Sequence, residues 1–312
     1  VLVTPEMAAE MLTHNVDNYR KLTPRIVQQY ARDMASNKWD FNGQTITFDD
    51  KGHLNNGQHR LTAVVESGVA IWFVIVRGVK PESRVTVDTQ YKRTIGQILD
   101  AEGESNATVL GAALGALYRF KLGDEFKSQK NGSGASPRDL LEMLQTYPEI
   151  RSSVKLGKAL GAQIRCPVGI MAALHFVLWE RCPDDADAFY SSLTTGANLS
   201  EDSPIFLLRK AFERDQKEIR KLTARHRLAL TIKAWNLWIT GETMKQLSWR
   251  PGGSKPEPFP EIMWPVGAEG RRERDKGSPR NPWDNRRFTE REEPPHRATG
   301  RGRDRKPQGG HR

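Results

Sequence analysis

Cysteine is nearly absent from this sequence, with Cys166 and Cys182 the only two among 312 residues. Their spacing fits neither a metal-binding pair nor a redox pair, and two thiols cannot build a disulfide framework. Each lies beside apolar, helix-like sequence, so we expect both to be small buried side chains in a reducing compartment. The seven histidines are scattered without an HExxH segment or a Cys/His cluster, so we expect no protein-caged zinc site.

Long hydrophobic runs are lacking as well. No stretch approaches the roughly 18 apolar residues of a membrane span, and the N-terminus lacks the basic-then-apolar pattern of a signal peptide. We therefore expect a cytoplasmic protein with no membrane partner. Hydrophobic residues still make up 37% of the chain, which argues against global disorder. At roughly 100–200 residues per domain, the length allows one or two folded units plus a tail.

One short polar segment, residues 54–61, reads Leu-Asn-Asn-Gly-Gln-His-Arg-Leu and carries most of the chemistry. Residues 45–48 before it alternate polar and apolar like a half-buried strand, and residues 49–52 supply turn chemistry, which predicts a hairpin. After it, an apolar stripe at helical spacing runs to Gly68, a residue suited to the position just past a helix end. Gly57 is therefore expected where a strand turns into a short helix.

The first turn of that helix, with Gln58, His59 and Arg60, is a candidate anion site. The first four N–H groups of a helix have no internal partner, and the macrodipole adds partial positive charge there. Gly57 lets a ligand approach the backbone, while Arg60 offers a planar fork of donors and His59 a titratable donor, which suits a phosphate group. The alternative is an ordinary strand-to-helix turn whose Arg and His pair with neighbouring carboxylates. The phosphate interpretation requires an accessible corner with Arg60 facing a cavity.

Residues 56–61, Asn-Gly-Gln-His-Arg-Leu, resemble the signature of the ParB/sulfiredoxin superfamily, in which a Gly-x-x-Arg turn at a helix start holds nucleotide phosphates. Over roughly residues 1–100 the order of elements is similar to that of ParB-like domains from phages and mobile elements: a helix after Thr23-Pro24, Trp39, the strand at residues 45–48, the turn, and a buried strand at residues 71–76. The resemblance implies a nucleoside triphosphate, ATP or CTP, as ligand. Its phosphates would contact Asn56, Gly57, Gln58, His59 and Arg60.

Flanking residues extend the resemblance. Asn18 and Arg20 match a short Asn-x-Arg segment before the first helix, and Asp88 with Arg93 matches an Asp followed by Arg-Thr after the last strand. The resemblance implies that Asn18, Arg20 and Arg93 lie near the nucleotide. The alternatives are that Asn18 and Arg20 are ordinary exposed loop residues, and that Asp88 forms a surface ion pair with Arg93.

A catalytic role is implied for two residues, His59 and Asp88. Asp88 follows Val85 and Val87, which alternate like an edge strand, and a carboxylate there would hold Mg²⁺ or accept a proton. His59 would contact the phosphates from the helix start. Catalysis of phosphoryl transfer is mostly positioning and electrostatics, so these few groups would suffice.

Departures from the superfamily pattern narrow the function. Sulfiredoxins place a reactive Cys immediately before the His-Arg pair, and Gln58 stands there, which excludes sulfinic-acid repair. Chromosome-partitioning ParB proteins show Gly-Glu-Arg-Arg at this turn, so its Gln-His-Arg argues against a CTP-gated DNA clamp. The Asp-Gly-Gln-His-Arg proteins of DNA-modification clusters are closer, although Asn56 replaces their Asp.

After Arg93 the periodicity becomes helical. Residues 121–135 read as a loop, and Ser136 followed by Pro137 predicts a helix start there, with Ser136 as the cap. Further apolar helical stretches are predicted at residues 167–179, 204–212 and 224–239, with Met171 and His175 in the core.

This half of the chain also invites a DNA-binding interpretation, because ParB relatives place helix-turn-helix elements after the nucleotide-binding domain. A basic run lies beside Trp235 and Trp238: Lys217, Arg220, Lys221, Arg225 and Arg227. The alternative is that these cations are the solvated face of an amphipathic helix.

The C-terminal tail carries much of the charge. Residues 269–312 hold 14 Lys and Arg against 8 Asp and Glu, on a chain of net charge +10. The tail is rich in Pro and Gly with few apolar side chains beyond Trp283 and Phe288, so we expect it to be disordered. It either holds nucleic acid through phosphate contacts or is a solubilising segment with no dedicated partner.

Together these features predict an α+β protein with three parts. Residues 1–100 would form a ParB/sulfiredoxin-like nucleotide-binding domain with a small mixed sheet, residues 101–262 an α-helical domain, and residues 263–312 a disordered basic tail. The first hypothesis is NTP hydrolysis or phosphoryl transfer with Mg²⁺ in a phage or mobile-element DNA-processing or DNA-modification system. The alternatives are a non-catalytic DNA-binding or partition-type regulatory protein, and a ParB-like nuclease, which the lack of an acidic cluster near the motif disfavours.

Overall fold

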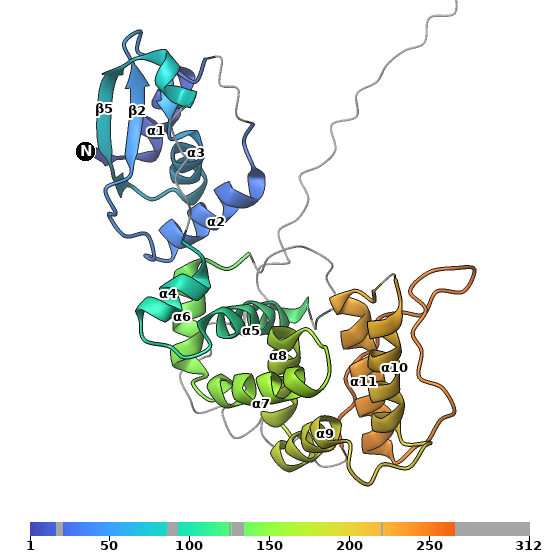
Figure 1. The fold of residues 1–312 in the computed structure, drawn as a ribbon. Coiled ribbons are helices and arrows are strands. Elements are labelled where there is room, and N and C mark those ends of the chain that lie inside the picture. Colours follow the sequence, from blue (N-terminus) through green and yellow to red (C-terminus); the bar gives the residue numbers. More distant parts are fainter. Residues whose placement is uncertain (17–20, 86–92, 125, 127–133, 220, 266–312) are drawn as a thin grey trace, which may run out of the picture.

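The computed structural model describes residues 1–16, 21–85, 93–124, 126, 134–219 and 221–265. It is a mixed α+β structure, as expected, and its buried hydrophobic side chains form two separate clusters. One cluster runs from Val3 to Phe73 and the other from Leu99 to Phe259. We call the parts that carry them the N-terminal unit and the helical unit; Figure 1 shows the first above the second.

The N-terminal unit consists of a three-stranded mixed sheet, a separate two-stranded sheet and three helices. Its elements in chain order are β1 (Leu2–Val3), α1 (Pro5–Thr13), α2 (Pro24–Ala35), β2 (Thr45–Asp49), β3 (Leu54–Asn56), α3 (Gln58–Ser67), β4 (Ile71–Trp72), β5 (Val74–Val79) and the 3₁₀ helix η1 (Pro81–Val85). The predicted hairpin is confirmed, because β2 pairs antiparallel with β3, and on its other side β2 pairs in parallel with β5. β1 pairs antiparallel with β4, and α1 and α2 both pack against α3.

The corner between β3 and α3 is confirmed as well. Gly57 precedes α3 with φ 118°, and Gly68 follows it with φ 68°, both in the left-handed region that favours glycine. A Cβ atom added to Gly57 would lie 2.6 Å from Cδ1 of Ile46, a fully buried residue of β2. Glycine at this position therefore meets two demands, a positive φ and close packing against the sheet.

Two predictions about strands after the motif were wrong in part. The stretch at residues 71–76 is not one buried strand, because β4 and β5 are separated at Phe73, and Trp72 and Val74 are exposed. Val85 does not extend an edge strand but ends the 3₁₀ helix η1. Pro81 begins that helix with its φ already near the helical value, and Asn55 of β3 donates a hydrogen bond to Oγ of Ser83, 2.9 Å away, which ties η1 to the sheet.

The start of α2 is held by a tertiary contact rather than by a side-chain cap. Thr23 occupies the N-cap position, but its side chain makes no capping hydrogen bond. Its backbone N–H instead donates to Nε2 of His59 at 3.0 Å. The tertiary contact with α3 thus takes the place of the local cap.

The helical unit contains α4 (Ile95–Ala101), α5 (Ala107–Arg119), the π-helical turn η2 (Phe120–Asp124), α6 (Pro137–Thr146), α7 (Ile150–Gln163), α8 (Val168–Trp179), α9 (Pro183–Thr195), α10 (Pro204–Lys217) and α11 (Ala224–Thr240). The apolar helix α8 lies in its middle and packs against α5, α7 and α9. Met171 and His175 of α8 are buried, as expected, and so is Cys182. Cys166 is partly buried. The predicted loop at residues 121–135 begins with η2, where Gly123 breaks the helix with φ 87°.

The predicted cap of α6 is confirmed and extended. Asp139 donates its backbone N–H to Oγ of Ser136 at 3.2 Å, and the Ser136 N–H donates to Oδ2 of Asp139 at 2.9 Å. This reciprocal pair is a capping box, with Pro137 in the first turn. It fixes the Asp139 carboxylate at the border of the two units.

The Gly57 corner leads to a stability prediction. Gly68→Ala, in open space, should cost about 1 kcal/mol of unfolding free energy through its positive φ. Gly57→Ala should cost about 2–5 kcal/mol, because the clash with Ile46 adds to the backbone strain. Urea unfolding of the two variants, followed by circular dichroism, measures the difference; equal losses would show that Ile46 moves aside freely.

Candidate functional site

The first turn of α3, which we call the Gly57 corner (residues 57–60), is buried in the structure. β3 leads into Gly57, which occupies the N-cap position of α3 and has no side chain with which to cap it. Gln58, His59 and Arg60 follow, all less than one-tenth exposed. The sequence motif is therefore in the predicted place, but the corner is enclosed rather than open.

Arg60 is held by the start of β2. Its Nη1 donates to Oε1 of Gln44 at 2.6 Å, and its Nη2 donates to the carbonyl oxygen of Thr45 at 2.9 Å. Both acceptors are uncharged. These two bonds fix the plane of the guanidinium, which the local sequence around residues 57–60 could not indicate.

His59 and Gln58 connect α3 to the first two helices. Nε2 of His59 accepts the Thr23 N–H, so this nitrogen is unprotonated while the bond persists. Oε1 of Gln58 accepts a hydrogen bond from the side-chain amide of Asn15, 3.2 Å away. The corner thus joins the end of the α1 segment to the start of α2.

Of the other predicted site residues, the structure describes Asn56 and Arg93. Asn56 is half-buried at the end of β3, opposite Thr47 of β2, next to the corner. Arg93 is exposed just before the α4 cap. Asn18, Arg20 and Asp88 lie outside the described residues, so their predicted places around the nucleotide stay predictions.

Sequence reasoning missed the partners that hold the corner: Asn15, Thr23 and Gln44. Each contributes through a contact made across 16 to 43 residues of sequence. No local motif marks them. Gln44 precedes the strand at residues 45–48, and only the pairing of that strand brings it to Arg60.

A Ser-His-Asp chain exists in the helical unit but is a feature of its core. Nδ1 of His175 lies 2.9 Å from Oγ of Ser153, and Nε2 lies 3.0 Å from Oδ1 of Asp187. Ser153 is only 2% exposed, so its hydroxyl has no access to a substrate. Burial lowers the pKa of His175, against the opposing effect of Asp187, which favours a neutral, structural histidine.

The basic run near α11 packs largely onto the protein itself. Nε of Arg227 donates to Asp215 at 3.0 Å, and Lys221 donates to backbone carbonyl oxygens at the end of α10. The Arg225 guanidinium lies 4.5 Å from the ring centroid of Phe259. Arg220 and residues 266–312 lie outside the described part of the chain. Lys221, Arg225 and Arg227 thus contact the protein rather than forming a purely solvated face, and the DNA-binding interpretation stays a prediction.

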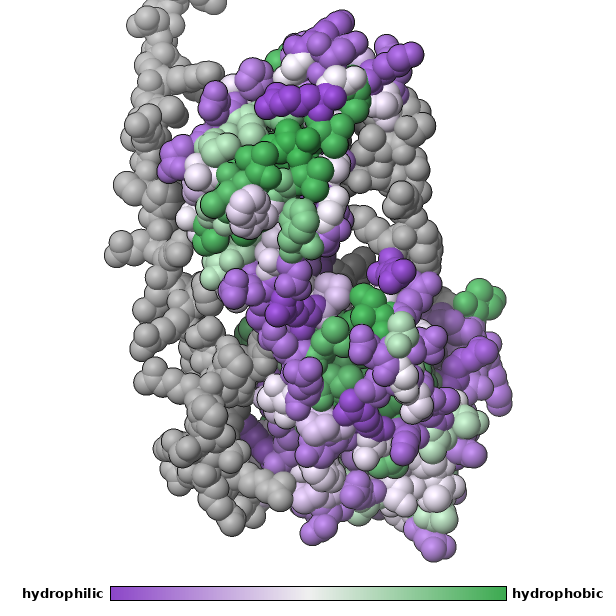
Figure 2. Space-filling model, turned by 90° about the vertical axis from the view of Figure 1, so that its left-hand side faces the viewer, coloured by the Kyte–Doolittle hydropathy of each residue, from purple (hydrophilic) through white to green (hydrophobic). Residues whose placement is uncertain are grey.

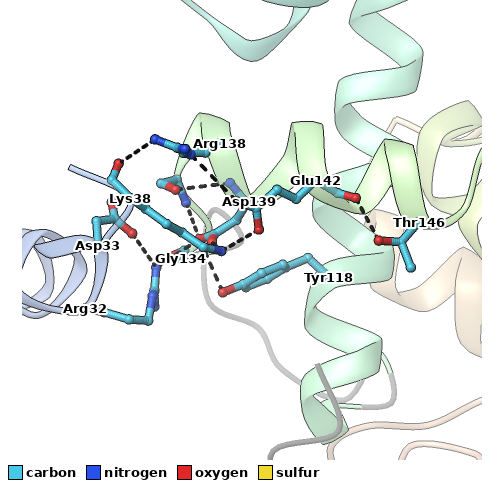
Figure 3. Close-up of polar contacts among 10 residues, drawn as sticks. Arg32, Asp33, Lys38, Tyr118, Gly134, Arg138, Asp139, Glu142 and Thr146 are labelled. Atoms are coloured by element: carbon cyan, nitrogen blue, oxygen red, sulfur yellow. Dashed lines mark hydrogen bonds and ion pairs between the residues drawn. The ribbon is translucent and has the colours of Figure 1, made fainter. Parts of the chain in front are cut away.

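A second polar cluster, unexpected from the sequence, joins the two units (Figure 3). We call Arg32, Asp33, Lys38, Tyr118 and Asp139 the junction cluster. Lys38 donates to Oδ1 of Asp139 at 2.9 Å, and Arg32 donates to Oδ2 at 3.2 Å. Arg32 also donates to the carbonyl oxygen of Gly134 at 2.9 Å. Two cations from the N-terminal unit thus hold one carboxylate of α6.

The two carboxylates of the junction cluster have opposite electrostatic environments. Burial, helped by the nearby charge of Asp139, raises the pKa of Asp33 to about 6. Burial alone would also raise the pKa of Asp139, but the Ser136 N–H, Lys38 and Arg32 outweigh it and hold that pKa below its ordinary value. Among the described residues, Oδ1 of Asp33 is buried without a hydrogen-bond donor. The sequence gives one indication that Asp33 is buried: it follows Tyr30 by three residues and therefore lies on the apolar side of α2.

The raised pKa of Asp33 predicts a pH dependence of stability. A carboxyl whose folded pKa is about 6, against an ordinary 3.8, takes up its proton more readily in the folded state, so unfolding free energy rises as pH falls from about 7 to 4. Asp33→Asn removes the charge and keeps the shape. It should stabilise the protein at pH 7.5, by at most about 3 kcal/mol for a shift of two pKa units, and have little effect near pH 4. Thermal unfolding of both proteins across this range measures the difference.

Asp139→Asn is the matched control. It removes the charge that Lys38 and Arg32 contact. Because Lys38 keeps Glu142 at 2.6 Å and the Arg32 side chain is 39% exposed, the loss at pH 7.5 should be about 1–3 kcal/mol. If Asp33→Asn also destabilises at pH 7.5, the assignment of Asp33 as an unfavourable buried charge is wrong.

Comparisons with protein-family models, curated protein sequences and solved structures find no match for this chain. Within the described residues, no helix combines the length and the apolar character that crossing a bilayer requires. Nor do His, Cys, Asp and Glu side chains gather in threes as metal ligands anywhere in that part of the chain. The Gly57 corner and the junction cluster are thus interpreted from their own chemistry.

Proposed function

We propose that this protein binds a nucleoside triphosphate, ATP or CTP, at the Gly57 corner, as a ParB-like protein of the phage or mobile-element type. The supporting observation is the left-handed Gly57 at the start of α3, which has no Cβ to keep a ligand from the backbone. A phosphate suits such a helix start, because backbone N–H groups and the helix dipole both favour an anion there.

Arg60 would be a second phosphate-binding group at the corner. Its bonds to Gln44 and Thr45 hold the guanidinium in one orientation, which lowers the ordering cost when a ligand binds. A charge-assisted hydrogen bond from such a group contributes about 1.5–3 kcal/mol. The position of Arg60 on the first turn of α3 puts it on the same turn as the backbone N–H groups.

The enclosed corner sets a condition on this binding. Residues 57–60 are buried, so a triphosphate enters only if α3 separates from the segments that cover its start. The bonds between Asn15 and Gln58 and between Thr23 and His59 join those segments to α3. We therefore propose that nucleotide binding opens these two contacts.

The activity we propose is hydrolysis or phosphoryl transfer, in a cytoplasmic DNA-processing or DNA-modification system. Asp88 with Mg²⁺, and His59 at the helix start, would be the reacting groups. These roles and the DNA context rest on the resemblance of residues 56–61 to the ParB/sulfiredoxin signature.

A second candidate is a non-catalytic protein in which the nucleotide regulates DNA binding. One specific observation favours it: Gln58 and His59 of the corner hold Asn15 and Thr23, which lie beside α1 and α2, so a ligand that opens these contacts would release both segments. A regulatory protein needs only the binding event and the opening of the corner.

Replacing Arg60 tests the binding proposal. Arg60→Lys keeps the charge but loses the planar fork, so affinity for ATP or CTP should fall at least tenfold by isothermal titration calorimetry, with and without Mg²⁺. Arg77→Lys, at an exposed arginine of β5 in the same unit, should bind like the unmodified protein. The unliganded melting temperature of each variant shows whether it is folded.

The outcomes separate the candidates. Failure of the unmodified protein to bind either nucleotide, or equal binding by Arg60→Lys, contradicts the proposed site. Phosphate release with bound nucleotide supports the enzyme. Binding without release, together with salt-sensitive binding to duplex DNA, supports the regulatory protein.

A further inference from the structure

The two units of the protein are joined by polar contacts and not by a shared core. Their buried hydrophobic side chains, together with the partly buried ones that pack on them, form two sets with no member in common. Figure 2 shows hydrophilic side chains between the apolar areas of the two units on the face in view. Among the described residues, hydrogen bonds and ion pairs join residues 32–40 of the N-terminal unit to residues 134–142 of the helical unit. Such a border lacks the hydrophobic burial that holds two domains together as one body.

Charges of opposite sign face each other across this border. Besides its bond to Asp139, Lys38 has its Nζ 2.6 Å from Oε2 of Glu142. At the exposed rim, Arg138 of α6 donates to Oδ2 of Asp40 at 2.8 Å. Each unit therefore contributes both cations and anions, so charge pairing sets how the two units align. Ion pairs that water reaches are weakened by salt, because mobile ions screen them.

Asp33 opposes this pairing. Its side chain is only 10% exposed, and its Oδ1 has no hydrogen-bond donor among the described residues. The charged and titratable groups around it are Arg32 of its own helix, Lys38, Asp139 of α6 and Tyr118 of α5. Because like charges repel, an ionised Asp33 disfavours the close approach of Asp139 and of the unit that carries it. Protonation of Asp33 removes this repulsion and leaves Arg32 and Lys38 paired with Asp139.

This repulsion depends on pH near neutrality. Burial and the charge of Asp139 raise the pKa of Asp33 to about 6 when the units are in contact. Asp139 belongs to the other unit, so its contribution is lost when the units separate, and the pKa of Asp33 then falls toward its ordinary value. The closed arrangement therefore takes up a proton more readily than an open one, and closing is favoured as pH falls from about 8 to about 5.

We propose that the junction cluster is an ionic latch, about which the two units open and close as rigid bodies, and that protonation of Asp33 closes it. Opening separates Lys38 and Arg32 from Asp139 but leaves both cores intact, since neither core extends across the border. The capping box of Ser136 and Asp139 also survives, because it lies within one unit. The latch operates without a nucleotide at the Gly57 corner.

Energy transfer between two dyes, one on each unit, measures the opening. The dyes are attached at Glu66→Cys in α3 and Lys155→Cys in α7, both exposed positions. The native thiols of Cys166 and Cys182 react slowly with the dyes, because burial raises the pKa of each to about 11.

Salt and pH should each change the transfer in the unmodified protein. Transfer should fall as salt rises from about 0.1 M to about 1 M, because the Debye length shrinks from about 10 Å to about 3 Å. It should rise as pH is lowered from about 8 to about 5. Asp33→Asn should give high transfer across this pH range, since it lacks the titrating charge.

Lys38→Glu tests the latch at its centre. It places a negative charge against Asp139 and Glu142 and should raise the open-to-closed ratio at low salt at least about tenfold, because like charges in contact repel strongly. Lys51→Glu is the matched control: it makes the same change at an exposed lysine in the turn between β2 and β3. It should show the transfer of the unmodified protein.

A charge swap at the rim separates opening from damage to the fold. Arg138→Glu should lower transfer by repelling Asp40, and adding Asp40→Arg should restore it, which a misfolded variant would not do. Transfer that is the same at every salt concentration and pH overturns the proposal. So does a folded Lys38→Glu, by circular dichroism, with unchanged transfer, a Lys51→Glu that opens as readily, or a charge swap that fails to restore transfer.

Discussion

The contact that most of this architecture depends on is the set of hydrogen bonds around the Asp139 carboxylate. Within α6 it closes the capping box with Ser136. Across the junction it accepts hydrogen bonds from Lys38 and Arg32, which come from the α2 segment of the N-terminal unit. The buried Asp139 carboxylate therefore caps the start of α6 and also joins the two units. Burial, together with this negative charge, raises the pKa of Asp33 and makes the ionised form of Asp33 unfavourable. The Asp139 side chain is only 3% exposed, whereas that of Lys38 is 19% and that of Arg32 39% exposed, so the carboxylate depends on these contacts more than the two cations do.

The Gly57 corner and the junction cluster share α2. At its N-terminal end, the Thr23 N–H meets His59 of the corner; along its length, Arg32 and Asp33 reach the junction cluster. A ligand that separates Thr23 from His59 would act on the same helix that contacts the helical unit. The structure thus contains a continuous physical connection between the proposed nucleotide site and the rest of the protein, through one rigid element.

The strand β2 links the Gly57 corner to the rest of its sheet. It is the central strand, with β3, which leads into Gly57, on one side and β5 on the other. Ile46 of β2 packs against Gly57, while Thr45 and Thr47 lie on the opposite side of the strand, with their hydroxyl oxygens 3.1 Å apart. Ile46 is fully buried and Thr47 is only 9% exposed, so the strand that supports the corner is covered on both sides.

The sequence alone determined the local features: the β2–β3 hairpin, glycines at both ends of α3, the Ser136 cap and the helical second half. These follow from periodicity and from the conformational preferences of Gly, Pro and Ser, which act over a few residues. Only the tertiary structure decided that Arg60 is held by Gln44 and Thr45, that Thr23 turns its N–H to His59 instead of capping α2, that Trp72 lies exposed, and that Asp33 and Asp139 meet across 106 positions. Those outcomes depend on which surfaces pack together, and burial and long-range hydrogen bonds leave little trace in neighbouring residues.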